Sequence, residues 1–102
     1  MNITVNARHM NVTESLSDYA KGKAEKLNKF YNGITSIDVI MDPDGGHGKV
    51  EMVVQAARKN TFVAHAESQD MYAGVDRCVD KLTQQIRKHK EKIRDRQSGH
   101  MH

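Results

Sequence analysis

The stretch ESQDMYAGVDRCVDKLTQQIRKHKEKIR, residues 67–94, decides the fold because it predicts a long helix with one apolar face. Its apolar residues recur in steps of three, four and seven, which places them on one narrow stripe along about six helical turns. The stripe consists of Tyr72, Val75, Val79, Leu82, Ile86 and Ile93. Asp70, at the start of the helix, is a favourable N-cap residue. Such a helix requires a second layer of structure to cover its stripe.

The segments before this helix predict that the second layer is a sheet. Alternating apolar and polar residues predict four strands. These strands are expected at residues 2–8, 35–42, 49–57 and 61–68. Ala64 and Ala66 are small enough for a helix to lie close to the last strand. The segment PDGGHG, residues 43–48, is expected to form a turn or loop.

Another helix is predicted between the first two strands, within residues 11–33. Thr13 is its expected N-cap, and Gly33 fits its C-terminal stop. The order β-α-β-β-β-α predicts a parallel first pair joined by a right-handed crossover, followed by a meander. We therefore expect an α+β fold of two layers, in which both helices cover one face of a four-stranded sheet. The domain is predicted to span residues 1–96, with a flexible tail at 97–102.

The composition fits one small domain in a reducing compartment. The chain has 102 residues, of which 37% are apolar, and it has no Trp. Its single cysteine, Cys78, cannot form an internal disulfide, which favours a cytoplasmic protein. The N-terminus lacks the pattern of a secretory signal, and no stretch approaches the ~20 apolar residues of a membrane span. Neither a membrane nor a small-molecule substrate is expected as a partner.

The positive charge is concentrated and one-sided. Residues 76–96 hold eight of the sixteen Lys and Arg residues. At 100° per residue, one flank of the predicted helix is basic and the opposite flank carries acids. The basic flank holds Arg77, Lys81, Lys88 and Lys92, with Gln85 between them, whereas the acids are Asp76, Asp80 and Glu91. Beyond Ile86 the helix becomes basic nearly all round, through Arg87, Lys90 and Arg94.

Lys23, Lys26 and Lys29 of the first helix add to this charge, and two basic flanks are expected to meet across a groove if the helices pack side by side. Such a ladder of cations suits phosphates. The alternative, equally weighted, is an ordinary solvated face whose cations favour the helix dipole. Because exposed aromatics for base stacking are scarce, recognition of RNA backbone and shape is favoured over readout of single-stranded bases.

No other residues form a convincing chemical site. The six histidines are scattered, and only His100 and His102 lie close in sequence. These two are expected to chelate a metal ion adventitiously at most. Cys78 is expected to be a part-buried, inert thiol. No catalytic set is present, so the sequence predicts neither an enzyme nor a cofactor or functional metal.

Both predicted helices resemble those of the bacterial ribosome hibernation factors, a family also called the ribosome-associated inhibitor or sigma-54 modulation family. In the second helix, the resemblance is carried by Asp70-Met71-Tyr72, Val75-Asp76, Asp80-Lys81-Leu82 and the cations Lys88, Lys90 and Lys92. In the first helix, it is carried by Thr13, Glu14, Leu16, Lys23, Lys26 and Leu27. The resemblance extends over the chain to about position 96.

The resemblance implies a fold similar to a double-stranded-RNA-binding domain and a function without catalysis. Family members bind the small ribosomal subunit at the decoding site and in the channel for messenger and transfer RNA. They stop translation and promote storage of inactive, dimerised ribosomes in stationary phase. A chain that ends soon after Arg96 resembles the short hibernation-promoting form, which works with a separate ribosome modulation factor.

By motif match, contacts to 16S ribosomal RNA are expected from six lysines, and helix geometry adds two arginines. The lysines are Lys23, Lys26, Lys81, Lys88, Lys90 and Lys92, and the arginines are Arg77 and Arg87. Two alternatives remain at this stage. A general binder of double-stranded RNA would present similar basic flanks, and a protein-protein adaptor of the sigma-54 modulation type would need no affinity for RNA.

Overall fold

The computed structural model describes residues 1–44 and 47–99, and the side chains among them except those of residues 44 and 93–99. Its elements follow the predicted order. One short 3-10 turn follows the first helix, and another follows the third strand. The strands are β1 Asn2–Ala7, β2 Ile34–Asp44, β3 His47–Ala56 and β4 Asn60–Ser68. The helices are α1 Glu14–Glu25 and α2 Met71–Gly99, and the 3-10 turns are η1 Lys26–Lys29 and η2 Ala57–Lys59.

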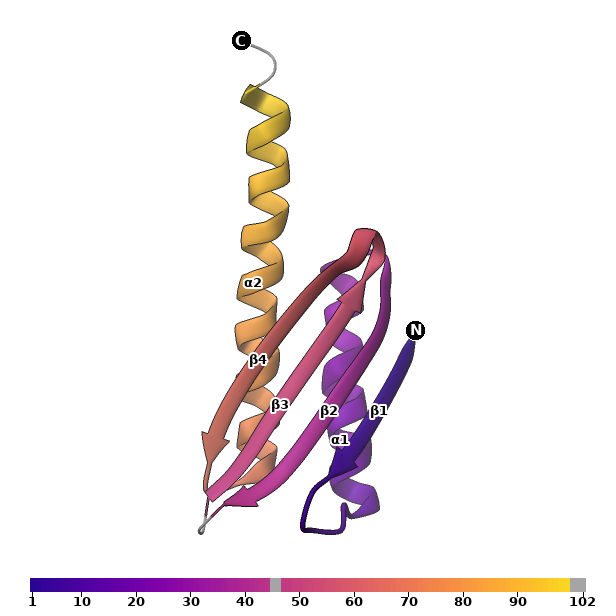
Figure 1. Cartoon of the computed structure of the whole chain (residues 1–102), viewed down its shortest axis with the longest axis vertical. Coiled ribbons are helices and arrows are strands. Elements are labelled where there is room, and N and C mark those ends of the chain that lie inside the picture. The colour runs from indigo at the N-terminus through magenta and orange to yellow at the C-terminus, as the bar shows by residue number, and fades with distance from the viewer. Residues whose placement is uncertain (45–46, 100–102) are drawn as a thin grey trace.

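The sheet has the order β1-β2-β3-β4. β1 runs parallel to β2, and the two following pairs are antiparallel, as the crossover and meander predict. Both helices lie on one face of the sheet (Figure 1), where α1 packs against β1 and α2 packs against β3 and β4. The predicted two-layer α+β fold is therefore confirmed.

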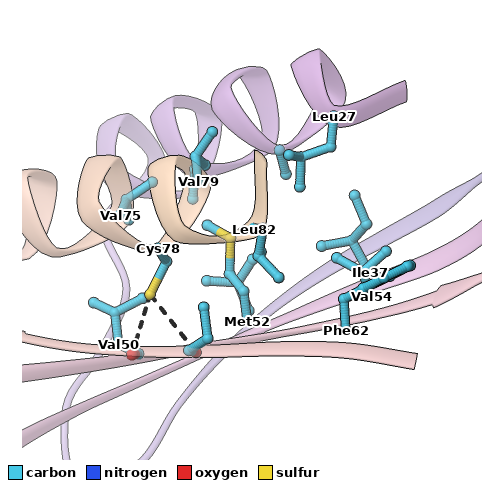
Figure 2. Packing of buried hydrophobic residues seen from close by; sticks show 14 of the residues in the cluster. Leu27, Ile37, Val50, Met52, Val54, Phe62, Val75, Cys78, Val79 and Leu82 are labelled. Carbon is cyan, nitrogen blue, oxygen red and sulfur yellow. Dashed lines mark hydrogen bonds between the residues drawn. The ribbon is translucent and has the colours of Figure 1, made fainter. Parts of the chain in front are cut away.

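The core lies between the sheet and the two helices. Alternate residues of β2, β3 and β4 are buried beneath the two helices, and the stripe residues Val75, Val79, Leu82 and Ile86 are all buried as well. Figure 2 shows Leu82 above the sheet and Val79 beside α1. The side chain of Ile93, the last predicted stripe residue, lies outside the described part of the chain. Thr13 is the N-cap of α1 as predicted, since its hydroxyl accepts from the Leu16 amide at 3.1 Å.

α2 approaches the sheet closely because small residues line the contact. A Cβ added to Gly74 would lie 2.8 Å from Cγ2 of Val50. The predicted close approach at Ala64 is confirmed, because the Cys78 thiol donates to the carbonyl oxygens of Val50 at 3.3 Å and Ala64 at 3.8 Å (Figure 2). Cys78 is fully buried at the centre of this contact, and burial raises its pKa to about 11.

The structure corrects the predicted loop at residues 43–48. β2 continues through Pro43 to Asp44, and β3 begins at His47, so most of this segment is strand. Proline is tolerated here because the pairing of β1 with β2 ends at Met41, which leaves β2 with a neighbour on one side only. α2 also extends to Gly99, three residues beyond the predicted boundary at Arg96, and residues 100–102 lie outside the described part of the chain.

Tyr72 corrects the predicted apolar stripe. Its exposed fraction is 37%, whereas Val75 is fully buried. Three residues of helix place Tyr72 about 60° around the axis from Val75, which turns it toward α1 and away from the sheet. There it packs edge-to-face against Tyr19, with ring centroids 5.0 Å apart.

Candidate nucleic-acid interface

A groove of about 410 Å³ separates α1 and η1 from α2. Its α1 side carries Lys23 and Lys26, and Phe30 lies at its end, just after η1. Its α2 side carries Asp76, Asp80 and Thr83, above a floor formed in part by Val79. The expectation that two basic flanks meet across this groove is therefore wrong. The apolar stripe fixes the rotation of α2, and that rotation turns its acidic flank toward α1.

A hydrogen-bonded cluster joins the two helices at the start of the groove. The Tyr19 hydroxyl donates to Asp76 at 2.6 Å, and the Lys23 ammonium lies 3.5 Å from the same carboxylate and 5.5 Å from the centre of the Tyr19 ring. The charge of Asp76 raises the pKa of Lys23, and the hydrogen bond to Asp76 raises the pKa of Tyr19. Lys23 is therefore charged but paired, which leaves it less free to meet a phosphate than the prediction assumed.

The charge of the groove reverses farther along α2. Arg87 and Lys90 lie on the same flank as Asp76, about three and four turns later, and both contact Phe30, just after η1. The Lys90 ammonium donates to the carbonyl oxygen of Phe30 at 2.8 Å, and the Arg87 guanidinium lies 5.7 Å from the centre of the Phe30 ring. Together with Glu91 they surround a smaller hollow of about 190 Å³. The groove is thus acidic beside the start of α2 and basic beside Phe30.

The opposite flank of α2 lies along the outer edge of β4. Its side chains donate to three outward carbonyl groups of that strand, at every second residue. Arg77 donates to Glu67 at 3.0 Å, Lys81 to His65 at 2.5 Å, and Gln85 to Val63 at 2.8 Å. Arg77, Lys81 and Gln85 therefore lie on one flank of α2, as helix geometry predicts. However, Arg77 and Lys81 have a structural partner, which the sequence did not reveal.

Lys88 and Lys92 continue this flank beyond those contacts. Both side chains are exposed. Among the described side chains of residues 1–43 and 47–92, none forms a hydrogen bond or an ion pair with either lysine. Of the predicted site residues on this flank, these two are the most available to an external anion.

The open face of the sheet has mixed charge. A hollow of about 310 Å³ on this face is lined by Arg8 and Lys49 together with Asp42, Glu51 and Glu67. Cations and carboxylates alternate within it, so it offers no uniformly positive surface to a polyanion. The basic end of the helical layer is the better candidate for binding nucleic acid.

Two residues of this site were missed at the sequence level. Phe30 was not expected at the site, yet it contacts both Arg87 and Lys90 and lines both hollows. Asp76 was noted as a member of the acidic flank and of the family resemblance, but not as the partner of Tyr19 and Lys23. Both roles depend on how the two helices pack, which the sequence pattern of either helix alone does not specify.

The described side chains hold no metal cluster. Among residues 1–43 and 47–92, no three His, Cys, Asp or Glu side chains gather closely enough to hold a metal ion. His100 and His102 lie outside that range. Likewise, none of the helices in residues 1–44 and 47–99 is long and apolar enough to cross a membrane.

A family described as "Sigma 54 modulation protein / S30EA ribosomal protein" matches residues 3–94 of the chain. The ribosome hibernation promoting factor of Azotobacter vinelandii is 37% identical over 99 residues, which cover 97% of this chain and 92% of the relative. The factor of the same name from Escherichia coli (strain K12) is 31% identical over 100 residues, covering 92% of this chain and 98% of the relative.

Solved structures are also similar to this chain. The N-terminal domain of Protein Y from Thermus thermophilus has a TM-score of 0.79 at 27% identity, and the match covers 87% of this chain and 99% of that one. A ribosomal subunit interface protein from Coxiella burnetii has a TM-score of 0.82 at 26% identity, covering 89% and 99%.

Proposed function

The chain belongs to the sigma 54 modulation protein / S30EA ribosomal protein family, and on this premise we propose that it is a ribosome hibernation factor. In this proposal it binds the small ribosomal subunit in the channel that holds messenger and transfer RNA. Binding blocks translation and promotes storage of inactive, dimerised ribosomes in stationary phase. The relatives named as hibernation promoting factors support the general function.

The observation that carries the proposal is the basic end of the helical layer. Lys26 of η1 and Arg87 and Lys90 of α2 come from segments distant in sequence and lie around one aromatic side chain, Phe30. Lys90 and Arg87 are held by the contacts to Phe30 before any ligand arrives. Cations fixed in this way lose less side-chain entropy when they meet a phosphate than free lysines do. Arg87 is further suited to a phosphate because its planar guanidinium donates two parallel hydrogen bonds.

The predicted RNA-binding residues then divide by availability. Lys26, Arg87, Lys88, Lys90 and Lys92 are proposed to make the main contacts to 16S ribosomal RNA. Lys23 contributes less because it is paired with Asp76. Arg77 and Lys81 act near the RNA but also hold the β4 edge, so part of their effect on binding is structural.

Inhibition in this proposal is simple occupancy. A protein seated in the channel excludes messenger RNA and transfer RNA by volume, and it releases condensed counterions from the phosphates that it contacts. No proton transfer, nucleotide or metal is needed at any step. A separate ribosome modulation factor is proposed to act with the bound protein when ribosomes pair.

Sedimentation with purified ribosomal subunits tests the proposal. The protein should migrate with the small subunit at about one copy per particle, and messenger RNA with initiator transfer RNA should displace it. A synthetic RNA duplex is the matched competitor. If the duplex binds as tightly as the small subunit, the protein is a general double-stranded-RNA binder. If neither RNA binds at any salt concentration, the adaptor alternative is favoured.

A further inference from the structure

The connection between β3 and β4 has a backbone that its sequence does not favour. Arg58 has φ 64° and ψ 29°, and Lys59 has φ 61°. Both values lie in the left-handed region, where a side chain crowds its own backbone. The Asn60 amide donates to the Ala57 carbonyl, so Arg58 and Lys59 are the two central residues of a tight turn within the three-residue connection. Turns with positive φ at both central positions favour Asn-Gly, because those residues adopt positive φ most readily. Here both central positions are instead occupied by long cationic side chains.

The turn is held in this conformation by its surroundings. The Ala57 amide donates to the Gly33 carbonyl at 2.8 Å. The Asn60 side chain donates to the Ala57 carbonyl and to the Tyr31 hydroxyl, each at 3.2 Å. These contacts connect the turn to the segment between η1 and β2. A strained conformation persists only where neighbouring structure imposes it in this way, and such positions concentrate at functional sites.

The same contacts bring the turn to the basic end of the helical layer. Tyr31 packs edge-to-face against both Phe62 of β4 and His89 of α2, with ring centroids 5.9 and 5.8 Å apart. Phe62 and His89 also pack against each other, at 5.4 Å. These three rings therefore join the segment after η1 to β4 and α2. Their immediate neighbours in sequence are Phe30 and Lys90, which belong to the basic end.

Arg58 and Lys59 are both exposed at this end. Among the described side chains of residues 1–43 and 47–92, none accepts a hydrogen bond from them or forms an ion pair with them. Their charges therefore have no role in holding this part of the fold together. If the turn served only the fold, Asn-Gly at these positions would make it more stable.

We infer that Arg58 and Lys59 form a third phosphate-binding segment, which extends the basic end of the helical layer from η1 and α2 onto the hairpin. The ligand is the sugar-phosphate backbone of RNA, and the inference rests on the proposed function in the ribosomal channel. The strained turn fixes the backbone from which the two cations extend, and Asn60, Tyr31 and His89 connect that backbone to α2 next to Lys90. Binding and fold stability then place opposite demands on the same two residues.

The decisive variant is Arg58→Asn/Lys59→Gly, which gives the hairpin its preferred turn residues and removes both charges. The urea midpoint should rise, because the strain at both residues is relieved. Binding to purified small subunits should weaken, and the salt slope should fall by roughly 2 if each cation contacts one phosphate. At about 0.1 M salt, two lost contacts correspond to roughly 60-fold weaker binding.

A second variant, Arg58→Gln/Lys59→Gln, removes the charges without introducing the preferred turn residues, and it should weaken binding to a similar extent. The control Arg8→Gln/Lys21→Gln removes the same charge from exposed positions on β1's end and on α1, away from the hairpin. Its binding should stay within about threefold of the wild-type value because it removes no direct phosphate contact.

The outcomes separate the inference from the proposed function. Wild-type protein that fails to bind small subunits would refute the proposed function itself. Wild-type protein that binds, with both hairpin variants binding equally well at an unchanged salt slope, would refute the inference alone. A lower urea midpoint for Arg58→Asn/Lys59→Gly would refute the premise that the native turn is strained. A higher midpoint together with weaker binding supports the inference.

Discussion

Two charge reversals on the same flank of α2 should have different consequences. Lys88→Glu/Lys92→Glu and Arg77→Glu/Lys81→Glu change the net charge by the same amount. In each variant the two changed positions are four residues apart on α2. Lys88 and Lys92 are exposed, and no described side chain is their partner, whereas Arg77 and Lys81 donate to carbonyl groups at the β4 edge. The first variant should therefore affect mainly RNA binding, and the second should affect both binding and stability.

The size of each effect follows from the contacts. Each phosphate contact contributes about 0.9 to the steepness with which log K falls as log salt concentration rises. One contact therefore raises the binding constant by about 0.9 log units at 0.1 M salt relative to 1 M salt. Loss of two contacts lowers affinity by roughly 60-fold, and the repulsion added by two carboxylates makes this a lower bound. For Arg77→Glu/Lys81→Glu, loss of two exposed hydrogen bonds should lower the free energy of unfolding by about 1–2 kcal/mol. Lys88→Glu/Lys92→Glu should change it by less than about 0.5 kcal/mol.

Binding to small subunits at several salt concentrations, with urea unfolding followed by circular dichroism, measures both quantities for both variants. If Lys88→Glu/Lys92→Glu binds within twofold of the wild type, this flank is an ordinary solvated face and does not contact RNA. If Arg77→Glu/Lys81→Glu unfolds at the wild-type midpoint, the hydrogen bonds to the β4 edge do not stabilise the fold.

Four further predictions concern the core, the helices, the thiol and the mechanism. Leu82→Ala should lower the free energy of unfolding by about 2–5 kcal/mol because Leu82 is fully buried, and a loss below about 0.5 kcal/mol in urea unfolding would contradict this packing. Gly22→Ala should stabilise the domain by up to about 1 kcal/mol because the added Cβ meets no atom within 4 Å. Gly74→Ala should destabilise it by about 1–2 kcal/mol because the added Cβ meets the stiff, buried Val50 side chain at 2.8 Å. Equal shifts in melting temperature for the two variants would argue against this contact. Cys78 should resist thiol reagents in the native state, since a pKa of about 11 in place of 9.0 reduces its thiolate roughly a hundredfold near pH 8, and rapid native labelling would show that the thiol is accessible. Cell-free translation should stop at about one protein per ribosome and recover as salt rises, with no effect of a chelator, and arrest at far lower ratios would rule out occupancy.

The fold could be predicted from the sequence because each element carries its own periodicity. The alternation in β1 and the stripe through Val79 and Leu82 are local patterns, and burial confirms them. The errors arose where a neighbour decides the outcome. Pro43 is in a strand because β1 ends before it, and Tyr72 is exposed because α1, and not the sheet, lies beside it.

The candidate site was less predictable for the same reason. The sequence identified the cations of α2 and correctly placed Arg77 and Lys81 on the flank opposite Asp76. It did not specify which flank faces α1, so the acidic side of the groove at Asp76 was unexpected. Nor did composition indicate that Arg58 and Lys59 adopt a left-handed turn, because their residue types disfavour it. That conformation depends on Gly33, Tyr31 and Asn60, which are contributed by two other segments.

The hydrogen bonds from α2 to the outer carbonyls of β4 also bear on whether the protein self-associates at high concentration. An exposed strand edge is a template on which a second chain can add its own strand, and this tendency grows with concentration. Arg77, Lys81 and Gln85 occupy the carbonyl groups that such a strand would need. In the proposed function the protein acts on ribosomes one to one, so it would have to accumulate to the abundance of ribosomes themselves. On the β4 side, self-association at that abundance is opposed by the same helix that carries the cations proposed to bind RNA.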